Sequence, residues 1–430
     1  MYDVIIIGGG AAGLMAAKLL SEAGREILIL EAKDKPGGRI RQIDALSFPA
    51  EGGAEFIHGN LTATIDLMHD AGIKKEKLKG KFCWVNNGKW NTGYNLFSNW
   101  DLLMQKLIAC DKDISVDAFL EKWFYEKKYE LLRKQFKNYV QGYDAADTKH
   151  ASILAIKKDM ESQDEDQWRP SSGYISIIDY LFKTIKKSRG VIKTGEVVQQ
   201  IKRNKNIEVI TKSGKYFCNK LIIAVPVGIL QCRKKNKSFI KFPACLDNHI
   251  MAAKNIGNGS VIKFLVEFDK AFWLDKSFLA DKKISAPSYF FADTIIPTWW
   301  TQYPSLHPLL TGWIAGPPAT KMKDYSEKKF KECILDSLSS VFSMPVWLLE
   351  EKIKNYMVVN WIKETHILGG YSFATIQSED ARNQLKKPFD DFFYFAGEYL
   401  AENSASTVDA ALQSGIEVAK KILISYQELL

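Results

Sequence analysis

The N-terminal segment YDVIIIGGGAAGLMAAKLLSEAGREILILEAKDKPGGR constrains the fold more than any other part of the chain. The apolar run Val4–Ile7 is typical of a buried parallel strand. Glycines follow in the G-x-G-x-x-G spacing, and good helix formers then continue to Ala23 and stop at Gly24. A second strand, Glu26–Leu30, leads into the acidic residue Glu31. This order predicts the first βαβ unit of a doubly wound α/β domain.

The glycine turn predicts a site for the pyrophosphate of a dinucleotide. Gly8 permits the tight turn, Gly10 lets a phosphate approach the backbone, and Gly13 lets the helix and strand pack closely. The start of the helix, which includes Ala12, offers free N–H groups and the positive end of the helix dipole. Glu31, followed by Ala32, is placed to accept hydrogen bonds from the adenosine ribose.

Two further glycine pairs indicate which dinucleotide is bound. Gly37 and Gly38 precede Arg39, and a second pair, Gly52 and Gly53, lies in PAEGGAEFIHG. An NAD domain usually needs no second phosphate-contacting loop at this point, whereas a flavin that is buried along its whole length does. The second loop therefore favours a flavin dinucleotide.

The C-terminal segment DDFFYFAGEYLAENSASTVDAALQSGIEVAKKIL predicts a return of the chain to the same ligand. A strand over Phe392–Ala396 is followed by Gly397 and Glu398, and open α/β sheets bind ligands at the carboxyl ends of their strands. Thr407 and Val408 begin the next predicted helix, whose N–H groups can meet an anion. We therefore expect both ends of the chain to converge on one cofactor, with a second domain inserted between them.

Length and composition argue against several classes of protein. The chain has 430 residues, 46% of them hydrophobic, which suffices for two or three domains. We expect neither a membrane-spanning helix nor a signal peptide, because no run of about 20 apolar residues and no basic leader is present. Six cysteines without metal or redox spacing favour a reducing compartment, and hence the cytoplasm. The net charge of +9 is spread along the chain, which argues against nucleic acid as a partner. The sequence assigns no oligomeric state.

The predicted strand in GNGSVIKFLVEF contains a lysine, Lys263. Phe264, Val266 and Phe268 share one face at a period of two, so Lys263 lies on the other face with Val261. Lysine is rarely buried without a partner. The second face therefore either meets water or turns the ammonium toward a cavity, and the spacing leaves both interpretations open.

Together these motifs resemble those of the flavin-containing amine oxidases, which include monoamine oxidases, polyamine oxidases and the flavin histone demethylases. The matching stretches occur in the family's order from Val4 to Leu423: IIIGGGAAGL, LEA, GGR, GGAEFIHG, GSVIKFLVEFDKAFW, NW with GGYS, and FAGE with STVDAAL. The resemblance implies FAD and an FAD-binding Rossmann-like α/β domain of the glutathione-reductase type, interleaved with an α+β substrate domain. It also implies oxidation of a C–N bond in a primary or secondary amine to an imine, with O2 reduced to H2O2.

The resemblance implies that the two domains alternate along the chain. We expect the FAD-binding domain to use residues 1–80, 190–250 and 375–430. The substrate-binding domain would then use residues 81–189 and 251–374. The second domain would combine an aromatic-rich helical segment with the strands of the middle of the chain.

The resemblance also assigns roles to individual residues. Lys263 would face the flavin and hold a water near its N5 atom, and its charge would favour the reduced flavin and O2 chemistry. Trp361 would stack near the isoalloxazine, and Tyr371 would form an aromatic wall beside it. His58 would lie at the substrate channel, where a histidine can bind a distal amine or titrate near neutrality. The cofactor would contact Glu31 at its ribose, Val198 at its adenine, and Arg39, Gly52, Gly53, Ala54, Glu55 and Glu398 along the remaining length.

Two departures separate this sequence from the monoamine oxidases. Their GGCY motif carries the flavin on a cysteine, whereas GGYS has Gly370 at that position, so we expect dissociable FAD. They also use two tyrosines as a cage, whereas Thr407 stands in the second position here, as in polyamine oxidases. A single aromatic wall at Tyr371 would admit a wider or longer amine. His58 also favours a polyamine, because similar motifs in polyamine oxidases place a histidine at the substrate channel.

Three other functions remain open. An L-amino-acid oxidase would pair the substrate carboxylate with an arginine, whereas Glu55 and Phe56 hold that position here and a carboxylate would repel the substrate. A desaturase or porphyrinogen-type oxidase acts on C–C bonds and would not need Lys263. A flavin-binding scaffold without turnover would be similar to the histone demethylases in their partner complexes, but the sequence shows no long protruding helical hairpin.

Overall fold

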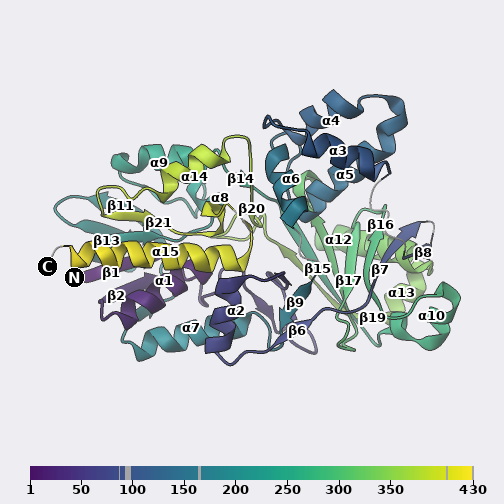
Figure 1. Cartoon of the computed structure of the whole chain (residues 1–430). Coiled ribbons are helices and arrows are strands. Elements are labelled where there is room, and N and C mark those ends of the chain that lie inside the picture. Colours follow the sequence, from purple (N-terminus) through teal and green to yellow (C-terminus); the bar gives the residue numbers. More distant parts are fainter. Residues whose placement is uncertain (87, 93–97, 163–165, 403–404, 429–430) are drawn as a thin grey trace.

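The structure, a computed structural model, has two bodies that lie side by side, each built around a β-sheet (Figure 1). The described residues are 1–86, 88–92, 98–162, 166–402 and 405–428. Both chain ends lie together at the far end of the first body (Figure 1). The long C-terminal helix α15 runs from these ends toward the junction of the two bodies (Figure 1).

The first body contains a seven-stranded sheet whose strands come from three separate parts of the chain. Five strands, β10, β2, β1, β13 and β21, are parallel, and β12 and β11 extend the sheet in antiparallel fashion. Val4–Ile7 is buried on both faces, as the apolar run predicts for a parallel strand. The strands are β1 (Tyr2–Ile7), β2 (Ile27–Leu30), β10 (Val191–Lys193), β11 (Val198–Arg203), β12 (Ile207–Thr211), β13 (Lys215–Ile223) and β21 (Phe393–Phe395).

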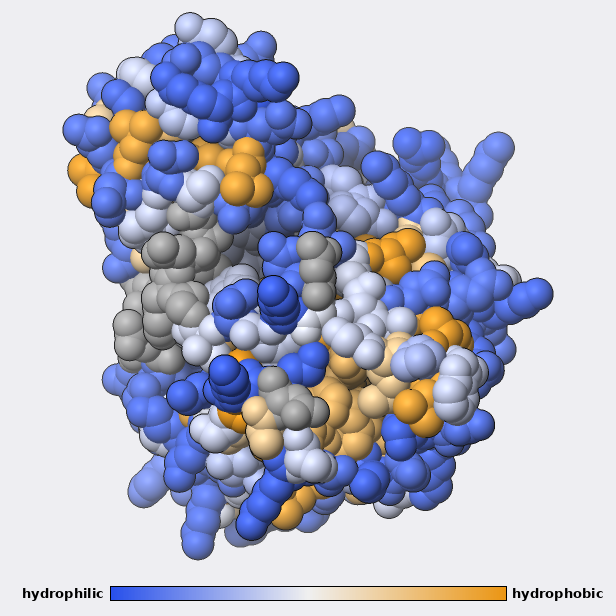
Figure 2. Space-filling model, turned by 90° about the vertical axis from the view of Figure 1, so that its right-hand side faces the viewer, coloured by the Kyte–Doolittle hydropathy of each residue, from blue (hydrophilic) through white to orange (hydrophobic). Residues whose placement is uncertain are grey.

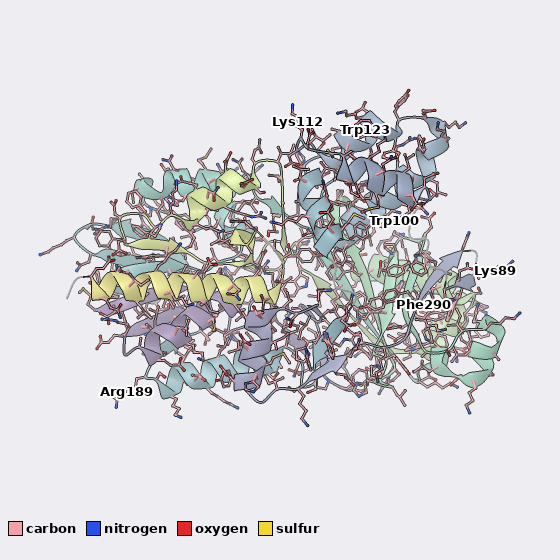
Figure 3. All side chains as sticks on the ribbon, viewed as in Figure 1. Lys89, Trp100, Lys112, Trp123, Arg189 and Phe290 are labelled. Carbon is pink, nitrogen blue, oxygen red and sulfur yellow. The ribbon has the colours of Figure 1, made fainter. Side chains whose placement is uncertain are left out.

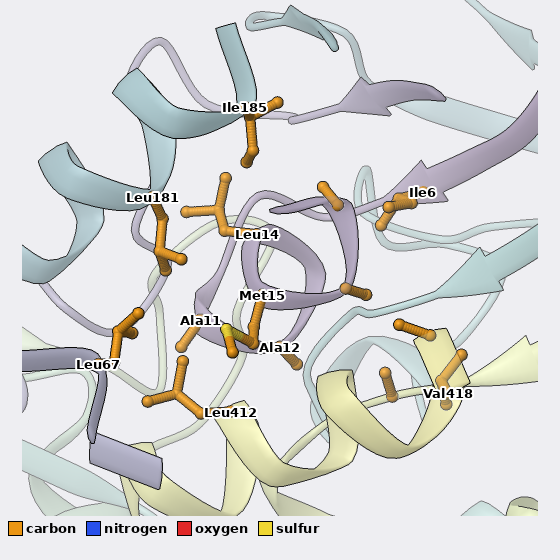
Figure 4. Close-up of a cluster of buried hydrophobic side chains, with 14 of the residues drawn as sticks. Ile6, Ala11, Ala12, Leu14, Met15, Leu67, Leu181, Ile185, Leu412 and Val418 are labelled. Carbon is orange, nitrogen blue, oxygen red and sulfur yellow. The ribbon is translucent and has the colours of Figure 1, made fainter. Parts of the chain in front are cut away.

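Helices cover both faces of this sheet. On one face, Leu14 and Met15 of α1 lie between Leu181 of α7 and Leu412 of α15 (Figure 4). The opposite face packs on α8, α9 and α14. The helices are α1 (Ala11–Glu22), α2 (Thr62–Asp70), α7 (Ile175–Lys187), α8 (Val227–Leu230), α9 (Asp247–Ala253), α14 (Ser378–Lys386) and α15 (Val408–Gln427).

Helix α7 corrects one predicted domain boundary. The sequence assigns residues 81–189 to the substrate domain, but Leu181 and Ile185 of α7 pack on α1 in the core of the first body (Figure 4). An amphipathic helix specifies that one face is buried but does not specify which element buries it. The start of the second FAD-binding segment therefore precedes residue 190, while the other predicted boundaries stay predictions.

The second body contains a seven-stranded sheet in the order β19-β15-β18-β17-β16-β7-β8. All neighbouring strands are antiparallel except β16 and β7. Phe264, Val266 and Phe268 of β15 face a core that also includes α12, and Val261 and Leu265 lie in a separate cluster on the opposite face. The strands are β7 (Lys81–Asn86), β8 (Lys89–Asn91), β15 (Val261–Phe268), β16 (Pro287–Ala292), β17 (Thr298–Thr301), β18 (Leu309–Ala315) and β19 (Ile353–Asn360).

Two groups of helices complete the second body. One packs against the core face of the sheet, and the other forms a separate lobe with its own apolar core. The first group is α10 (Lys276–Lys282), α11 (Gly316–Met322), α12 (Glu327–Phe342) and α13 (Val346–Lys352); the lobe is α3 (Trp100–Ile108), α4 (Val116–Phe124), α5 (Glu130–Tyr143) and α6 (Ile153–Ser162).

Short strand pairs connect these parts. In one three-stranded sheet, β9 pairs with β5 and β6, and in another pair β14 joins β20 at the junction of the two bodies. The short strands are β3 (Gln42–Ile43), β4 (Ala50–Glu51), β5 (Ile57–His58), β6 (Lys75–Lys77), β9 (Gln167–Pro170), β14 (Gly257–Asn258) and β20 (Ser372–Phe373).

The surface is mainly hydrophilic, with separate apolar patches on the face shown in Figure 2. Lys89, Lys112 and Arg189 project outward, whereas Phe290 lies inside the second body (Figure 3). Among the described residues, no single helix has the length and apolar composition needed to cross a membrane. The consecutive helices α12 and α13 meet that test only as a pair, and they are bent by 106°.

Candidate active site

A cavity of about 2350 Å³ extends from the glycine turn of the first body to the strands of the second body. Its lining includes Gly10 and Glu31 at one end and Lys263 and Trp313 at the other. Residues from the first and last segments of the chain line it together, as the sequence predicts. The carboxyl ends of β1 and β21 open toward it, where ligands bind in doubly wound sheets.

The glycine turn has the geometry of a phosphate cradle. Gly8 has a φ of +106°, which favours glycine at the tight turn. A Cβ atom on Gly13 would lie 2.1 Å from the carbonyl oxygen of Gly8, so the close packing of helix and strand requires glycine. A Cβ atom on Gly10 would meet no protein atom within 4 Å, so its backbone is open to a ligand in the cavity. These three roles fit the pyrophosphate of FAD.

Glu31 lies at the end of β2 with its carboxylate largely shielded from solvent. Its Oε2 accepts a hydrogen bond from Gly9 N at 2.7 Å, and its Oε1 accepts one from Lys33 N at 2.8 Å. Burial raises the pKa of the Glu31 carboxyl, although both N–H groups oppose that rise. A buried acceptor that also lines the cavity fits the ribose hydroxyls of FAD.

Arg39 and Glu398 bring together three distant parts of the chain. Arg39 Nη1 lies 2.7 Å from Glu398 Oε1 and donates to the carbonyl oxygen of Gly370, also at 2.7 Å. Glu398 Oε2 accepts a hydrogen bond from Ser372 Oγ at 2.6 Å. Glu398 is buried, and its ion pair with Arg39 holds it in place. This ion pair therefore forms part of the cavity wall between the two bodies.

The remaining predicted cofactor residues form the walls nearby. Trp361 Nε1 donates to the carbonyl oxygen of Gly52 at 3.1 Å, and a Cβ atom on Gly53 would lie 1.8 Å from the carbonyl oxygen of Arg39. Thr407 caps α15 by accepting a hydrogen bond from Ala410 N at 3.0 Å. The cap orients the first N–H groups of α15, beginning at Val408, toward the cavity.

Lys263 is buried, with a side chain that is 1% exposed. Its Nζ lies 2.7 Å from Glu55 Oε2 and donates to the carbonyl oxygen of Gly53 at 3.1 Å. It also lies 5.4 Å from the centre of the Trp300 ring. The solvated-face interpretation of this strand is therefore wrong, and the ammonium belongs to the cavity wall.

Glu55 lines the cavity, and protein groups engage its carboxylate. Its Oε2 contacts Lys263, and its Oε1 contacts Trp300 Nε1 at 3.0 Å and Arg169 Nη2 at 2.7 Å, so its role toward the cofactor stays a prediction. Burial opposes ionisation, yet Lys263 and Arg169 hold the pKa of Glu55 below its ordinary value. Both oxygens are occupied by protein cations and donors. The argument that Glu55 repels the carboxylate of an amino acid is therefore wrong, because its charge is already neutralised.

A row of aromatic rings leads from Lys263 across the cavity. Trp300 and Trp313 have ring centres 6.1 Å apart, and Trp313 and Tyr371 are stacked with centres 6.3 Å apart. The hydroxyl of Tyr371 donates to the carbonyl oxygen of Tyr143 at 2.6 Å. The prediction of a single aromatic wall is incomplete, because two tryptophans of the second sheet continue the wall that Tyr371 begins.

His58 lines the cavity between aromatic residues. Its ring centre lies 6.2 Å from Phe56 and 6.1 Å from Tyr143. Burial lowers the pKa of His58 to about 4. Of the two predicted roles, this lowered pKa disfavours titration near neutrality and favours a neutral imidazole that can accept a hydrogen bond from a distal ammonium.

Asp144 is an acidic residue of the cavity that the sequence does not indicate. It follows the C-terminal end of α5, next to the backbone groups that hold Tyr371 and Trp313. Its Oδ2 is buried and has no hydrogen-bond partner within the described part of the chain. Burial, and then the neighbouring Asp159, raise the pKa of Asp144 well above its ordinary value. Such a group favours a cationic ligand.

Most residues predicted from the sequence meet in this one cavity. All four predicted catalytic residues line it, and so do the predicted cofactor residues apart from Gly13 and Gly52. Gly13 serves the packing behind the turn, and Gly52 is held by Trp361. The residues that the sequence analysis missed are Glu51, which directly precedes the second glycine pair, and Asp144, Asp159, Arg169, Trp300 and Trp313, which lie in no recognisable motif.

Comparisons with known proteins agree with this geometry. The family described as flavin containing amine oxidoreductase matches residues 11–138 and 124–423. Polyamine oxidase 2 of Arabidopsis thaliana is 24% identical over 474 residues, covering 99% of this chain and 90% of that protein. Lysine-specific histone demethylase 2 of Homo sapiens is 24% identical over 452 residues, covering 98% of this chain and 53% of that protein.

Solved structures share the fold. Wild-type putrescine oxidase bound to putrescine superposes with a TM-score of 0.79 at 18% identity, covering 98% of this chain and 99% of that chain. Cyclohexylamine oxidase from Brevibacterium oxydans has a TM-score of 0.78 at 18% identity and covers 99% of both chains. The predicted fold class, an FAD-binding Rossmann-like domain with an interleaved second domain, is confirmed.

Proposed function

Because the chain belongs to the family of flavin-containing amine oxidoreductases, we propose that it oxidises a diamine or a polyamine with non-covalently bound FAD and reduces O2 to H2O2. FAD-dependent oxidation of an amine follows from the family itself. Our proposal adds three points: the substrate has a second nitrogen, O2 is the electron acceptor, and FAD is not covalently attached.

The residues around Lys263 favour a neutral reacting amine. Bound FAD would take two electrons and hydrogen from the amine, leaving an imine. A protonated amine has no lone pair to assist this loss. Lys263 and Arg169 share one carboxylate, so the positive charge that remains beside the cavity disfavours a second cation. The rings of Trp300, Trp313 and Tyr371 provide a mainly apolar wall. These residues select the neutral form of the nitrogen that reacts.

The observation that supports a second nitrogen is the buried Oδ2 of Asp144, which has no hydrogen-bond partner within the described part of the chain. It lies beyond Tyr371, at the end of the aromatic row opposite Lys263. A buried carboxylate without a partner is costly, and a substrate ammonium would supply the missing charge. A molecule with two nitrogens separated by a methylene chain fits this arrangement: one end neutral near Lys263 and one end cationic at Asp144.

The named relatives support this choice of substrate. Several similar proteins are named polyamine oxidases, and a protein of the same fold was solved with putrescine bound. The rival substrates find less support in the cavity. An amino acid would need an arginine for its carboxylate, but Arg39, which lines the cavity, is paired with Glu398, and Arg169 is paired with Glu55 and does not line the cavity.

A matched series of compounds tests the proposed substrate. Purified holoenzyme is mixed anaerobically with 1,4-diaminobutane, spermidine, spermine, 1-aminobutane, benzylamine and several L-amino acids, and flavin bleaching is followed. We expect bleaching by the diamine or the polyamines at rates at least tenfold above 1-aminobutane, and peroxide on admission of air. Bleaching by amino acids alone, or equal rates for the matched diamine and monoamine, would contradict the proposal.

We predict that FAD is released intact when the protein is denatured. A side chain at Gly370 would meet Val261 Cγ2 at 2.5 Å, and none of the six cysteines, all within the described residues, lines the cavity. No cysteine thiol, the group that the monoamine-oxidase motif uses, is therefore available in the cavity to attach the flavin covalently. Acid precipitation should leave the yellow colour in the supernatant, and colour that stays in the washed pellet would contradict the prediction.

We also propose a cytoplasmic location. All six cysteines are free thiols, and three of them are buried. Unpaired cysteines are typical of proteins that work in a reducing compartment. Subcellular fractionation with compartment markers tests this assignment.

A further inference from the structure

The buried group Arg169–Glu55–Lys263 joins three separate elements of the fold. The side chains are 15%, 5% and 1% exposed, respectively. Glu55 lies between the two cations, with 2.7 Å from Oε1 to Arg169 Nη2 and 2.7 Å from Oε2 to Lys263 Nζ. Arg169 comes from β9, Lys263 from β15, and Glu55 from the loop before β5.

This contact geometry constrains where the lysine can point. An ammonium has three N–H donors, and two of those of Lys263 are engaged by Glu55 and the carbonyl oxygen of Gly53. Because Lys263 also lines the cavity, its third donor remains for a bound molecule. A freely rotating lysine would have no such preference.

The positive and negative charges of the Arg169–Glu55–Lys263 group do not cancel. Two cations and one carboxylate leave a net charge of +1 beside the aromatic row. Lys263, and then Arg169, offset the burial cost that would otherwise favour the neutral form of Glu55. The other titratable groups that face the cluster are Tyr289, whose pKa burial raises, and Glu51, whose pKa burial raises to about 7.

We propose that Glu55 and Arg169 are positioning residues for Lys263: Glu55 orients and neutralises the ammonium, and Arg169 keeps Glu55 ionised. Without Glu55, two buried cations face each other with no carboxylate between them. The ammonium of Lys263 would then lose its proton more readily. Without both Glu55 and Arg169, that repulsion disappears. The inference rests on the proposed function only in that Lys263 faces bound FAD.

The first experiment follows O2 reoxidation of the flavin as a function of pH. Holoenzymes carrying Glu55→Gln, Arg169→Lys, or Glu55→Gln with Arg169→Gln are reduced with dithionite, which requires no amine, and mixed with O2 between pH 6 and 10. We expect the reoxidation rate to fall as the pH rises. In Glu55→Gln this fall should occur at least about one pH unit lower than in the unaltered enzyme, and one unit corresponds to 1.36 kcal/mol. The double variant should recover at least half of the shift, and Arg169→Lys should keep the original profile.

The second experiment uses the apo-protein. Its thermal unfolding is measured for the same variants, so the result does not depend on flavin turnover. Glu55→Gln should melt below the unaltered protein, and the double variant should melt above Glu55→Gln. Because Glu51 could ionise in place of Glu55, the series is repeated with Glu51→Gln.

The outcomes separate the two proposals. Coincident pH profiles for Glu55→Gln and the unaltered enzyme, or a double variant that recovers neither rate profile nor melting temperature, would overturn the positioning roles. If no amine reduces the unaltered enzyme, but the variants still differ as expected after dithionite reduction, the positioning roles of Glu55 and Arg169 stand. The proposed substrate is then contradicted instead.

Discussion

Replacing Lys263 by methionine is expected to slow flavin reoxidation by O2, or flavin reduction by the amine, by about two orders of magnitude or more. Methionine keeps the length and apolar stem but removes the charge and all three donors. That loss is on the scale of removing one preorganised electrostatic group from an active site. FAD should still bind, because the glycine turn and helix N-termini that fit its phosphates lie at the other end of the cavity. Stopped-flow measurement of both half-reactions checks this.

Lys220 provides a matched control for this variant. It is also a buried lysine, 4% exposed, and it contacts a carboxylate, that of Asp391, but it does not line the cavity. Lys220→Met should therefore lower thermal stability without changing either half-reaction by more than about twofold. Unchanged half-reaction rates in Lys263→Met, or equal decreases of these rates in Lys263→Met and Lys220→Met, would show that Lys263 takes no part in the reaction.

Replacing Asp144 by asparagine is expected to lower kcat/KM for a diamine or polyamine by about 30-fold or more. The carboxylate would pair with the distal ammonium in a buried site, and removing one partner from such a pair costs about 2–5 kcal/mol. Most of the effect should appear in KM, because the distal nitrogen does not react. The matched monoamine has no second ammonium, so its kcat/KM should change by less than about threefold. Steady-state kinetics with 1,4-diaminobutane and 1-aminobutane measures the difference.

An exposed acid serves as the control for Asp144. Asp324 has a side chain that is 69% exposed, pairs only with Lys363 among the contacts described, and does not line the cavity. Asp324→Asn should leave both substrates unaffected. If Asp144→Asn lowers kcat/KM equally for the diamine and the monoamine, the residue supports the fold of the cavity and does not recognise the second nitrogen.

The elements closest to the cofactor site could be predicted because their signals are local in the sequence. The run Val4–Ile7, the glycines that follow it and Glu31 occupy one short segment, and each has a conformational or packing requirement that few alternatives satisfy. The two faces of β15 also followed from a period of two. The burial of Lys263 did not, because alternation specifies two faces but does not specify what covers the second one.

The tertiary structure decided which charges meet. Glu55, Arg169 and Lys263 lie in different parts of the chain, and the pairing that neutralises Glu55 exists only once β9 and β15 are both in place. The same holds for α7, whose apolar face carries no information about its partner, and for Asp144, which is an ordinary acid until α5 ends beside Tyr371. Local patterns specify backbone conformation and which faces are buried. The charge state and the partner of a buried polar group depend on contacts between distant segments, and only the folded chain makes those contacts.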